Sequence, residues 1–427
     1  MPDLADALDT LKTLATPAEL RELAEAGRES AGGMRINAHI HLPPNFSAFE
    51  SVAQAVDLAK QQDVTVLGVS NYYDFTVYAE FIERCRAAGI FPLMGLEIIC
   101  MDDQLRETGV KINDPGNPGK IYLCGKGITR LDPMTDRASE LIETIRSNDD
   151  ARMAEMIDKL DRHFASAGLE LNLDADAVAE RIVARHDVPA ETVTLQERHV
   201  AQAFQEALFD RTDAETRIET LGRILGAPSK ATPDAAVTIQ GEIRSHLMKA
   251  GKPCFVAESF VSFAEAKELI LELGGIPCYP TLADGTTPIC AFEQPVGELI
   301  RNLRRRGIHC AEFIPTRNQP AVLQQYVTAM RDAGIAITGG TEHNTLELGP
   351  IDPPCAGGCH VPEPVREILR EGAELVAAHQ MLSLHGEDGY VTDNGEPNPA
   401  WETAEQRIAD LSALGAAALG RYHAFTG

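Results

Sequence analysis

Short apolar segments alternate with amphipathic helical segments in two separate stretches of this sequence. In the first stretch, residues 64–69 and 91–94 are apolar runs of strand length, with helical patterns before and between them. The alternation returns at residues 276–280, 308–313 and 335–339. Strands joined by helices through short loops form parallel sheets that are covered by helices. The sequence therefore predicts an α/β fold built on a parallel sheet.

Capping signals mark several helix boundaries in these stretches. Ser47-Ala48-Phe49-Glu50 is a capping box, which predicts that a helix begins there and extends to about residue 62. Gly89 follows a helical pattern over residues 78–88 and predicts its end. Ser262-Phe263-Ala264-Glu265 is a second capping box. The alternation is thus a series of discrete helices and strands.

The helical and alternating parts predict four segments. Residues 1–33 form an N-terminal helical appendage, and residues 34–127 and 251–350 carry the α/β pattern. Residues 128–250 contain amphipathic helices with polar connections and are predicted to be a helical insertion. Residues 351–427 are alanine-rich and predict a C-terminal helical extension.

Charge and composition restrict the partners of the chain. The formal net charge is -26, from 64 acidic and 38 basic residues, so the overall field repels nucleic acid and anionic membranes. The sequence has no apolar run of about 18 residues and no signal-peptide pattern. Its nine cysteines are scattered, as is typical of reduced thiols. We therefore expect a cytoplasmic protein that acts on a small molecule, in an oligomeric state that the sequence leaves open.

The residues with chemical potential gather at the predicted strand ends. His39 and His41 are two positions apart on an extended segment, so their imidazoles point to the same face. Glu97, Glu342 and His343 also follow apolar strands, and the carboxyl ends of parallel strands meet at one edge of a sheet. Imidazole and carboxylate are ligands for borderline-hard divalent cations. The sequence predicts a metal site at this edge.

Four motifs in this order resemble the PHP (polymerase and histidinol phosphatase) superfamily of metal-dependent phosphoesterases. They are His39-Ile40-His41, Gly95-Leu96-Glu97, the segment Gly274-Gly275-Ile276-Pro277-Cys278-Tyr279-Pro280, and Gly340-Thr341-Glu342-His343. The helical insertion is most similar to that of the RNase AM (nucleoside 3',5'-bisphosphate phosphatase) branch. The resemblance implies a distorted (β/α)7 barrel with a helical insertion, and a first-metal set of His39, His41, Glu97 and Glu342.

The chain departs from the family pattern at the remaining ligand positions. Asn71-Tyr72 stands where the family carries Asp-His, Tyr122 replaces a histidine, and Cys278-Tyr279-Pro280 replaces Ala-His-Pro. His343 is displaced by one position from the usual histidine. Family members commonly bind up to three ions, so these losses predict a single divalent ion, which is zinc, manganese or iron.

Three interpretations of the function follow from this resemblance. The first is a single-metal hydrolase of the PHP type that cleaves a small phosphoester with a metal-activated water. The second is a PHP-derived lyase, isomerase or non-phosphate hydrolase acting on a small sugar-like or carboxylate substrate, because one ion neutralises a phosphate transition state less well than a cluster. The third is a catalytically degenerate binding module.

Eight further residues are candidates for catalysis or substrate binding. Hydroxyl and imidazole groups near the metal act either as proton donors or as space-filling groups, and Arg and Lys side chains at strand ends either bind an anionic substrate or are surface charges. Glu312 lies inside an apolar strand, where a buried acid requires a partner, such as a ligand histidine. The catalytic candidates are Tyr72, Tyr122, Tyr279 and His343, and the substrate-binding candidates are Arg317, Lys126, Arg198 and His199.

Overall fold

The structure, a computed structural model, describes residues 3–27 and 34–426 and divides into two compact units. The first unit comprises Met1–Leu42, Ser51–Ile142 and Val261–Gly427, and the second comprises Pro43–Glu50 and Glu143–Phe260. The longer segment of the second unit begins 15 residues later than the predicted insertion (143 against 128) and ends 10 residues later (260 against 250). The described residues of the predicted terminal segments, 3–27 and 351–426, belong to the first unit, together with the α/β pattern.

A mixed sheet forms the centre of the first unit. Seven strands follow the order β1-β2-β3-β4-β6-β7-β8, and the short strand β5 pairs with β3 outside this path. The path is nearly closed, because Ile40 of β1 bridges to Glu342 just after β8, and the His41 N–H donates to the Glu342 carbonyl at 2.8 Å. This arrangement confirms the predicted α/β barrel. The strands are β1 (Arg35–Ile40), β2 (Val64–Val69), β3 (Phe91–Met101), β4 (Lys120–Lys126), β5 (Val261–Ser262), β6 (Ile276–Thr281), β7 (Cys310–Phe313) and β8 (Ala336–Gly339).

The strand β4 breaks the predicted parallel arrangement. It runs antiparallel to both of its neighbours in the barrel, β3 and β6, whereas β1-β2-β3 and β6-β7-β8 are parallel. The connection from β3 to β4 contains only the short helix α5 (Asp103–Glu107), and an antiparallel pair needs no helical crossover. The prediction of a wholly parallel sheet was therefore wrong at this strand.

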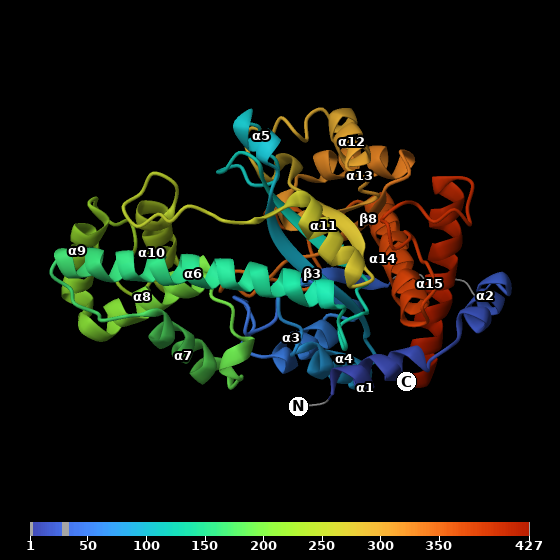
Figure 1. The fold of residues 1–427 in the computed structure, drawn as a ribbon, viewed down its shortest axis with the longest axis horizontal. Coiled ribbons are helices and arrows are strands. Elements are labelled where there is room, and N and C mark those ends of the chain that lie inside the picture. Colours follow the sequence, from blue (N-terminus) through green and yellow to red (C-terminus); the bar gives the residue numbers. More distant parts are fainter. Residues whose placement is uncertain (1–2, 28–33, 427) are drawn as a thin grey trace. The chain divides into compact units, whose positions relative to one another are not determined.

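Helices surround the sheet of the first unit, and Figure 1 shows α11 and α14 beside β3 and β8. The helix α14 lies very close to β8: a Cβ atom added to Gly372 would be 1.8 Å from the Ile337 carbonyl oxygen. The predicted C-terminal extension is thus part of the barrel wall. The helices of this unit are α1 (Leu4–Lys12), α2 (Pro17–Glu25), α3 (Val52–Gln61), α4 (Tyr78–Ala88), α5, α11 (Phe263–Glu272), α12 (Val296–Arg305), α13 (Pro320–Asp332), α14 (Glu363–Leu384) and α15 (Ala404–Thr426).

The capping signals were correct at two of three positions. Ser262 and Glu265 form a capping box at the start of α11, and Gly89, with a φ of 73°, ends α4. The predicted helix start at Ser47 was wrong. The N-cap of α3 is Ser51, whose hydroxyl accepts from the Gln54 N–H at 3.2 Å, while the Ser47 hydroxyl accepts from the nearby Phe49 N–H. Both serines have the residue type of an N-cap, so the sequence signal did not distinguish them.

The second unit is helical and has its own hydrophobic core. Phe164 and Phe204 lie at its centre with their ring centroids 5.1 Å apart, and Leu160, Leu208 and Leu221 are buried around them. The helix α6 (Asp136–Ser166) begins in the first unit and continues into the second. The other helices of this unit are α7 (Ala175–His186), the short 3-10 helix η1 (Ala190–Thr192), α8 (Glu197–Arg211), α9 (Ala214–Leu225), α10 (Ala236–Ile243) and the π-helix η2 (Arg244–Met248).

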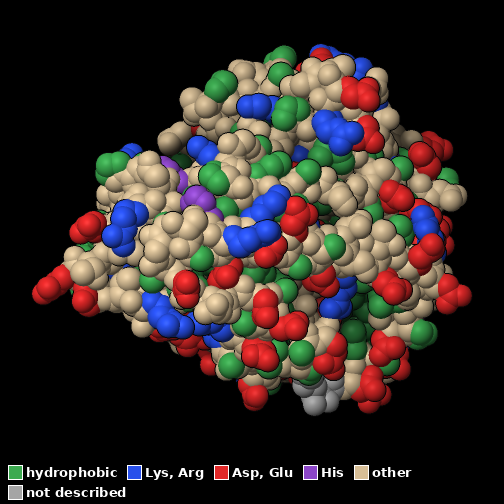
Figure 2. All heavy atoms as spheres, turned by 60° about the vertical axis from the view of Figure 1, so that its left-hand side comes forward, with side chains coloured by type: hydrophobic (Ala, Val, Ile, Leu, Met, Phe, Trp, Pro, Cys, Tyr) green, Lys and Arg blue, Asp and Glu red, His purple; other side chains and the backbone are tan. Residues whose placement is uncertain are grey.

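The surface reflects the acidic composition of the chain. Acidic side chains are spread over the face in Figure 2, with lysine and arginine side chains among them and hydrophobic atoms mostly in small separate patches. Among residues 3–27 and 34–426, no helix combines the length and the apolar character that crossing a membrane requires.

Candidate metal centre

His39 of β1, His41 just after β1 and Glu97 of β3 converge inside the barrel of the first unit. The Nε2 atoms of the two histidines are 3.2 Å apart, and the Glu97 Oε2 atom lies 3.3 Å from His39 Nε2 and 3.4 Å from His41 Nε2. All three side chains are buried. Three ligand atoms that face one another within this range are suited to bind one divalent cation.

Local backbone geometry places these three side chains together. His39 and His41 flank Ile40, the last residue of β1, so both imidazoles leave the chain on the same face. The Asn71 amide holds the chain after β1 by accepting from the Leu42 N–H at 2.8 Å and donating to the Leu42 carbonyl at 2.9 Å. Glu97 lies inside β3 and not at its end as predicted, because this strand continues to Met101.

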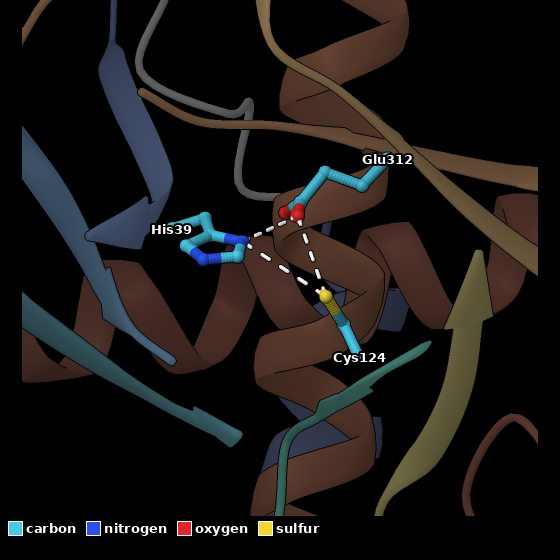
Figure 3. A group of neighbouring side chains, drawn as sticks. All are labelled: His39, Cys124 and Glu312. Carbon is cyan, nitrogen blue, oxygen red and sulfur yellow. Dashed lines mark hydrogen bonds and ion pairs between the residues drawn. The ribbon is translucent and has the colours of Figure 1, made fainter. Parts of the chain in front are cut away.

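A second buried group lies directly behind His39. The His39 Nδ1 atom is 2.6 Å from the Glu312 carboxylate, and the Cys124 thiol lies 3.8 Å from the same carboxylate oxygen (Figure 3). The other Glu312 oxygen accepts from the Lys126 ammonium at 2.5 Å. Glu312 therefore orients the His39 ring so that Nε2 faces His41 and Glu97. The predicted partner of this buried acid is thus a candidate ligand histidine.

Lys126 is buried and not a surface charge. Besides Glu312, its ammonium donates to the Ala38 carbonyl at 3.1 Å and to the Ser70 hydroxyl at 3.3 Å. Burial acts to lower the pKa of Lys126, but the Glu312 carboxylate outweighs burial and raises it above the usual range. The lysine is therefore a fixed positive charge inside the barrel, and its ammonium is fully engaged with the protein.

The protonation states of the three candidate ligands differ. Burial acts to raise the pKa of Glu97, but hydrogen bonds from His39 and His41 lower it well below its usual range, so Glu97 is a carboxylate. Burial lowers the pKa of His41 against the opposing effect of Glu97. Burial acts to lower the pKa of His39 as well, but Glu312 outweighs it and raises the pKa. A cation at His39 Nε2 competes with this second proton, because a ligand histidine must be deprotonated at the coordinating nitrogen.

Three more of the predicted residues lie around this cluster. The Tyr72 hydroxyl hydrogen-bonds to Glu97, and its ring stacks on His41 with centroids 5.1 Å apart. Tyr122 leaves β4 on the same face as Cys124, two residues away, and is half-buried. Arg317, at the end of the turn that follows β7, has a pKa raised by Glu342 and, more weakly, by Glu97. Tyr72, Tyr122 and Arg317 thus border the candidate metal centre.

Glu342 reaches the cluster through its backbone, while its side chain bonds to other residues. Its N–H donates to the His39 carbonyl at 2.9 Å, and its φ of 61° is uncommon for a residue with a side chain. Both of its carboxylate oxygens bond to the Arg317 guanidinium, and Asn344 donates to one of them at 2.7 Å. Binding of a cation by Glu342 therefore requires this ion pair to be rearranged.

The structure does not bring Tyr279 to the cluster, and it holds His343 at its edge. Tyr279 faces the opposite side of β6 from Cys278, and its hydroxyl donates to Glu293 at 2.8 Å. Cys278 pairs with Cys124 and shares its inward face. The two ring nitrogens of His343 lie 2.5 Å from the Thr341 hydroxyl and 3.0 Å from the Gly349 carbonyl.

Arg198 and His199 belong to the second unit, near the start of α8. The Arg198 guanidinium lies over the Phe46 ring at 5.9 Å from its centroid. The buried His199 ring accepts a hydrogen bond from the Gln196 N–H through Nδ1 at 3.2 Å, which caps the helix. Burial lowers the pKa of His199 to about 3, so the neutral form that can accept this bond persists in the folded state.

Acidification from pH 7 to pH 5 is expected to destabilise α8 through His199. The pKa of His199 is lower in the folded protein than in the unfolded chain. The contribution of neutral His199 to the stability of α8 is therefore complete above the unfolded pKa of 6.5 and is lost as the pH falls toward 3. We expect the free energy of opening of α8 to fall by about 2 kcal/mol between pH 7 and pH 5. Amide hydrogen exchange of residues 197–211, corrected for its intrinsic pH dependence, measures this change. His199→Gln keeps an acceptor without a titratable group and should remove this drop, and an equal drop in that variant would contradict the assignment.

Two features of the centre were missed in the sequence. Cys124 was one of several cysteines in apolar strands, and nothing nearby in the sequence connects it to His39. The partner of Lys126 lies 186 residues later in the chain (312 − 126), at Glu312. The sequence signals for this pair were a lysine at the end of one apolar strand and a glutamate inside another, because charges in buried strands require partners of opposite charge.

The donor set fits a divalent cation. Two imidazoles and one carboxylate with an open position are the ligands of many catalytic zinc sites. His39, Cys124 and Glu312 are a second set of close potential ligands, but Lys126 already neutralises Glu312, and His39 directs Nδ1 to it. The residues therefore fit an ion at Nε2 of His39 and His41 together with Glu97.

Two solved structures share the fold of this chain. A protein from Bifidobacterium adolescentis, provisionally named a metal-dependent phosphoesterase, is 16% identical, with a TM-score of 0.51 over 79% of this chain and 96% of that chain. An amidohydrolase from Chromobacterium violaceum is 15% identical, with a TM-score of 0.50 over 78% and 95% of the two chains. No family model and no curated protein matches the sequence. At these identities the likeness establishes the fold, a barrel of the kind found in metal-dependent hydrolases.

Proposed function

We propose that this chain is a single-metal hydrolase of the PHP type that cleaves a small phosphoester. The observation that carries the proposal is the convergence of His39 Nε2, His41 Nε2 and Glu97 Oε2 within 3.4 Å of one another in the barrel. Zinc, manganese or iron suits these nitrogen and oxygen donors. Glu342 is proposed as a further ligand that leaves Arg317 when the ion binds. The motif order, with the phosphoesterase-like fold, supports the PHP assignment.

The residues around the three ligands supply the other functions that hydrolysis requires. A divalent ion bound there supplies Lewis acidity and lowers the pKa of water. Arg317 offers a planar pair of donors that matches two oxygens of a phosphate, and its side chain is 38% exposed, so a substrate can reach it. Tyr72 and Tyr122 place hydroxyl groups at the border of the centre, where they orient the substrate or transfer a proton. His343 is a weaker candidate for this role because both of its ring nitrogens already have polar neighbours.

A combined measurement of metal content and turnover tests this function. The protein, purified without a histidine tag, should contain about one equivalent of zinc, manganese or iron by elemental mass spectrometry. It should hydrolyse 4-nitrophenyl phosphate or bis(4-nitrophenyl) phosphate, and a chelator should abolish turnover until metal is restored. Stoichiometric metal without phosphoesterase activity would contradict the phosphoester substrate. Absence of bound metal, even after incubation with these ions, would contradict the metal-dependent mechanism.

A non-phosphate substrate is the second candidate, and the electrostatics of the centre favour it. One ion and one accessible arginine offer less positive charge than a metal cluster for a phosphate transition state. Lys126 does not add to this charge at the substrate, because it is buried and bonded to Glu312, Ala38 and Ser70. The amidohydrolase with this fold makes amides the first alternative to assay. Chelator-sensitive cleavage of N-acylated amino acids, without cleavage of phosphoesters, would establish this candidate.

A further inference from the structure

A cavity of about 380 Å³ lies at the edge of the barrel opposite the metal centre. His309 and Ile335 line it and immediately precede the parallel strands β7 and β8, whereas Arg317 and Glu342 follow the same strands. The barrel separates this cavity from His39, His41 and Glu97. Its volume is within the range of about 300–1,000 Å³ that is typical of small-molecule sites.

Two arginines give the cavity an unbalanced positive charge. Arg407 of α15 is only 4% exposed, and none of the ion pairs among the described residues includes it. Its guanidinium lies 4.6 Å from the centroid of the Tyr390 ring, and its Nε atom has no hydrogen-bond partner within the described chain. A buried charge without a counterion is unfavourable. Arg304 of α12 lines the same cavity and donates to the Ala333 carbonyl at 2.5 Å.

The surroundings of His309 show that this positive charge dominates locally. Burial, together with the positive charges of Arg407, Lys267 and Arg304, lowers the pKa of His309 to about 4, while Glu396 opposes them. The acidic residue among those that line the cavity is Glu402, which is exposed to solvent. The chain as a whole has a net charge of -26, so a locally positive cavity is an exception to the overall charge distribution. An anion is the ligand that complements it.

The apolar wall of the cavity contains the single tryptophan of the chain. Trp401 lines the cavity together with Pro397 and Pro399. Its indole N–H donates to the Asp410 carboxylate at 2.8 Å, which fixes the orientation of the ring. A rigid indole beside arginines provides a surface on which a planar ring can stack. The wall therefore favours a ligand that combines a flat ring with an acidic group.

We infer that this cavity binds a small organic anion that carries a planar ring. The acidic group of the ligand pairs with Arg407 and Arg304, and its ring packs against Trp401. Binding supplies the counterion that the buried Arg407 lacks. Both a nucleoside monophosphate and an aromatic carboxylate have this chemistry, and the two are distinguished by experiment. The inference is independent of the reaction at the metal centre.

The intrinsic fluorescence of Trp401 tests the inference directly, because no other tryptophan contributes to the signal. The full-length protein is titrated with adenosine 5'-monophosphate, with benzoate and with uncharged adenosine. We expect a saturable change with at least one of the two anions and none with adenosine. A response to the nucleotide alone identifies a phosphate ligand, and a response to benzoate alone identifies a carboxylate. No saturable response to either anion would overturn the inference.

Variants of the two arginines locate the binding. Arg407→Gln and Arg304→Ala should each lower the affinity for the anion by about tenfold, because each removes a charge-assisted contact. Arg301→Ala is the matched control, since Arg301 lies on the same helix as Arg304, is exposed and pairs with Glu298. Arg304 is also exposed, so its variant remains informative if Arg407→Gln does not fold. Unchanged affinity in Arg304→Ala, or an equal loss in Arg301→Ala, would contradict the assigned site.

Discussion

Replacing His41 with alanine is expected to remove the metal ion and to abolish turnover. His41 Nε2 lies 3.2 Å from His39 Nε2 and 3.4 Å from Glu97 Oε2, so its loss leaves two of the three converging ligand atoms. Removing even a group that only orients a ligand typically costs 10–100-fold in metal affinity, so loss of a ligand itself should cost more than about 100-fold. Elemental mass spectrometry after dialysis, together with phosphoester and amide assays, measures both effects.

A matched histidine variant separates loss of the ligand from general damage. His423 of α15 is half-buried in the same unit, and its Nε2 atom lies 3.4 Å from the Thr65 carbonyl, so His423→Ala should keep metal and activity. The Trp401 fluorescence of both variants reports whether the first unit is folded. Metal at one equivalent and full turnover in a folded His41→Ala protein would show that these three residues are not the centre.

The parts of the fold that depend on local sequence were predicted well. Strand β2 has the predicted bounds of residues 64–69, and α4 ends at Gly89 as expected. A continuous apolar run predicts a strand, and a glycine that adopts a positive φ predicts the end of a helix. Each signal lies within a few residues, so the local sequence is sufficient for the prediction. The common face of His39 and His41 was predictable for the same reason, because it follows from their spacing of two along one short extended segment.

The parts that depend on pairing between distant segments were predicted less well. The direction of β4 is set by its neighbours β3 and β6, and its own apolar pattern is the same in either direction. Tyr72, Tyr122 and Tyr279 were equivalent in the sequence, yet the pleat of β6 turns Tyr279 toward Glu293 while Tyr72 reaches Glu97. Which face a strand presents to the candidate metal centre is fixed by register across the whole barrel, and this is not a local property.

The pairing of Lys126 with Glu312 should contribute strongly to the stability of the barrel. Among the described residues, Lys126→Met leaves His39, Cys124 and Thr338 as the neighbours that bond to the buried Glu312 carboxylate. Removing one partner of a buried ion pair typically costs about 3–5 kcal/mol of the free energy of unfolding, because the other charge stays buried without compensation. Urea denaturation at pH 7, followed by Trp401 fluorescence, measures the loss in the unit that contains the pair.

Two further variants distinguish an uncompensated charge from a simple loss of packing. Lys126→Met combined with Glu312→Gln removes both charges and should recover part of the lost stability, since no buried ion remains unpaired. Lys120→Met is the control on the same strand, because Lys120 pairs with Asp114 at 3.2 Å and the Asp114 side chain is 14% exposed, so water can solvate it. A smaller loss is expected there. Equal losses at positions 120 and 126, with no recovery in the double variant, would show that Lys126 acts through packing and that Glu312 does not depend on its charge.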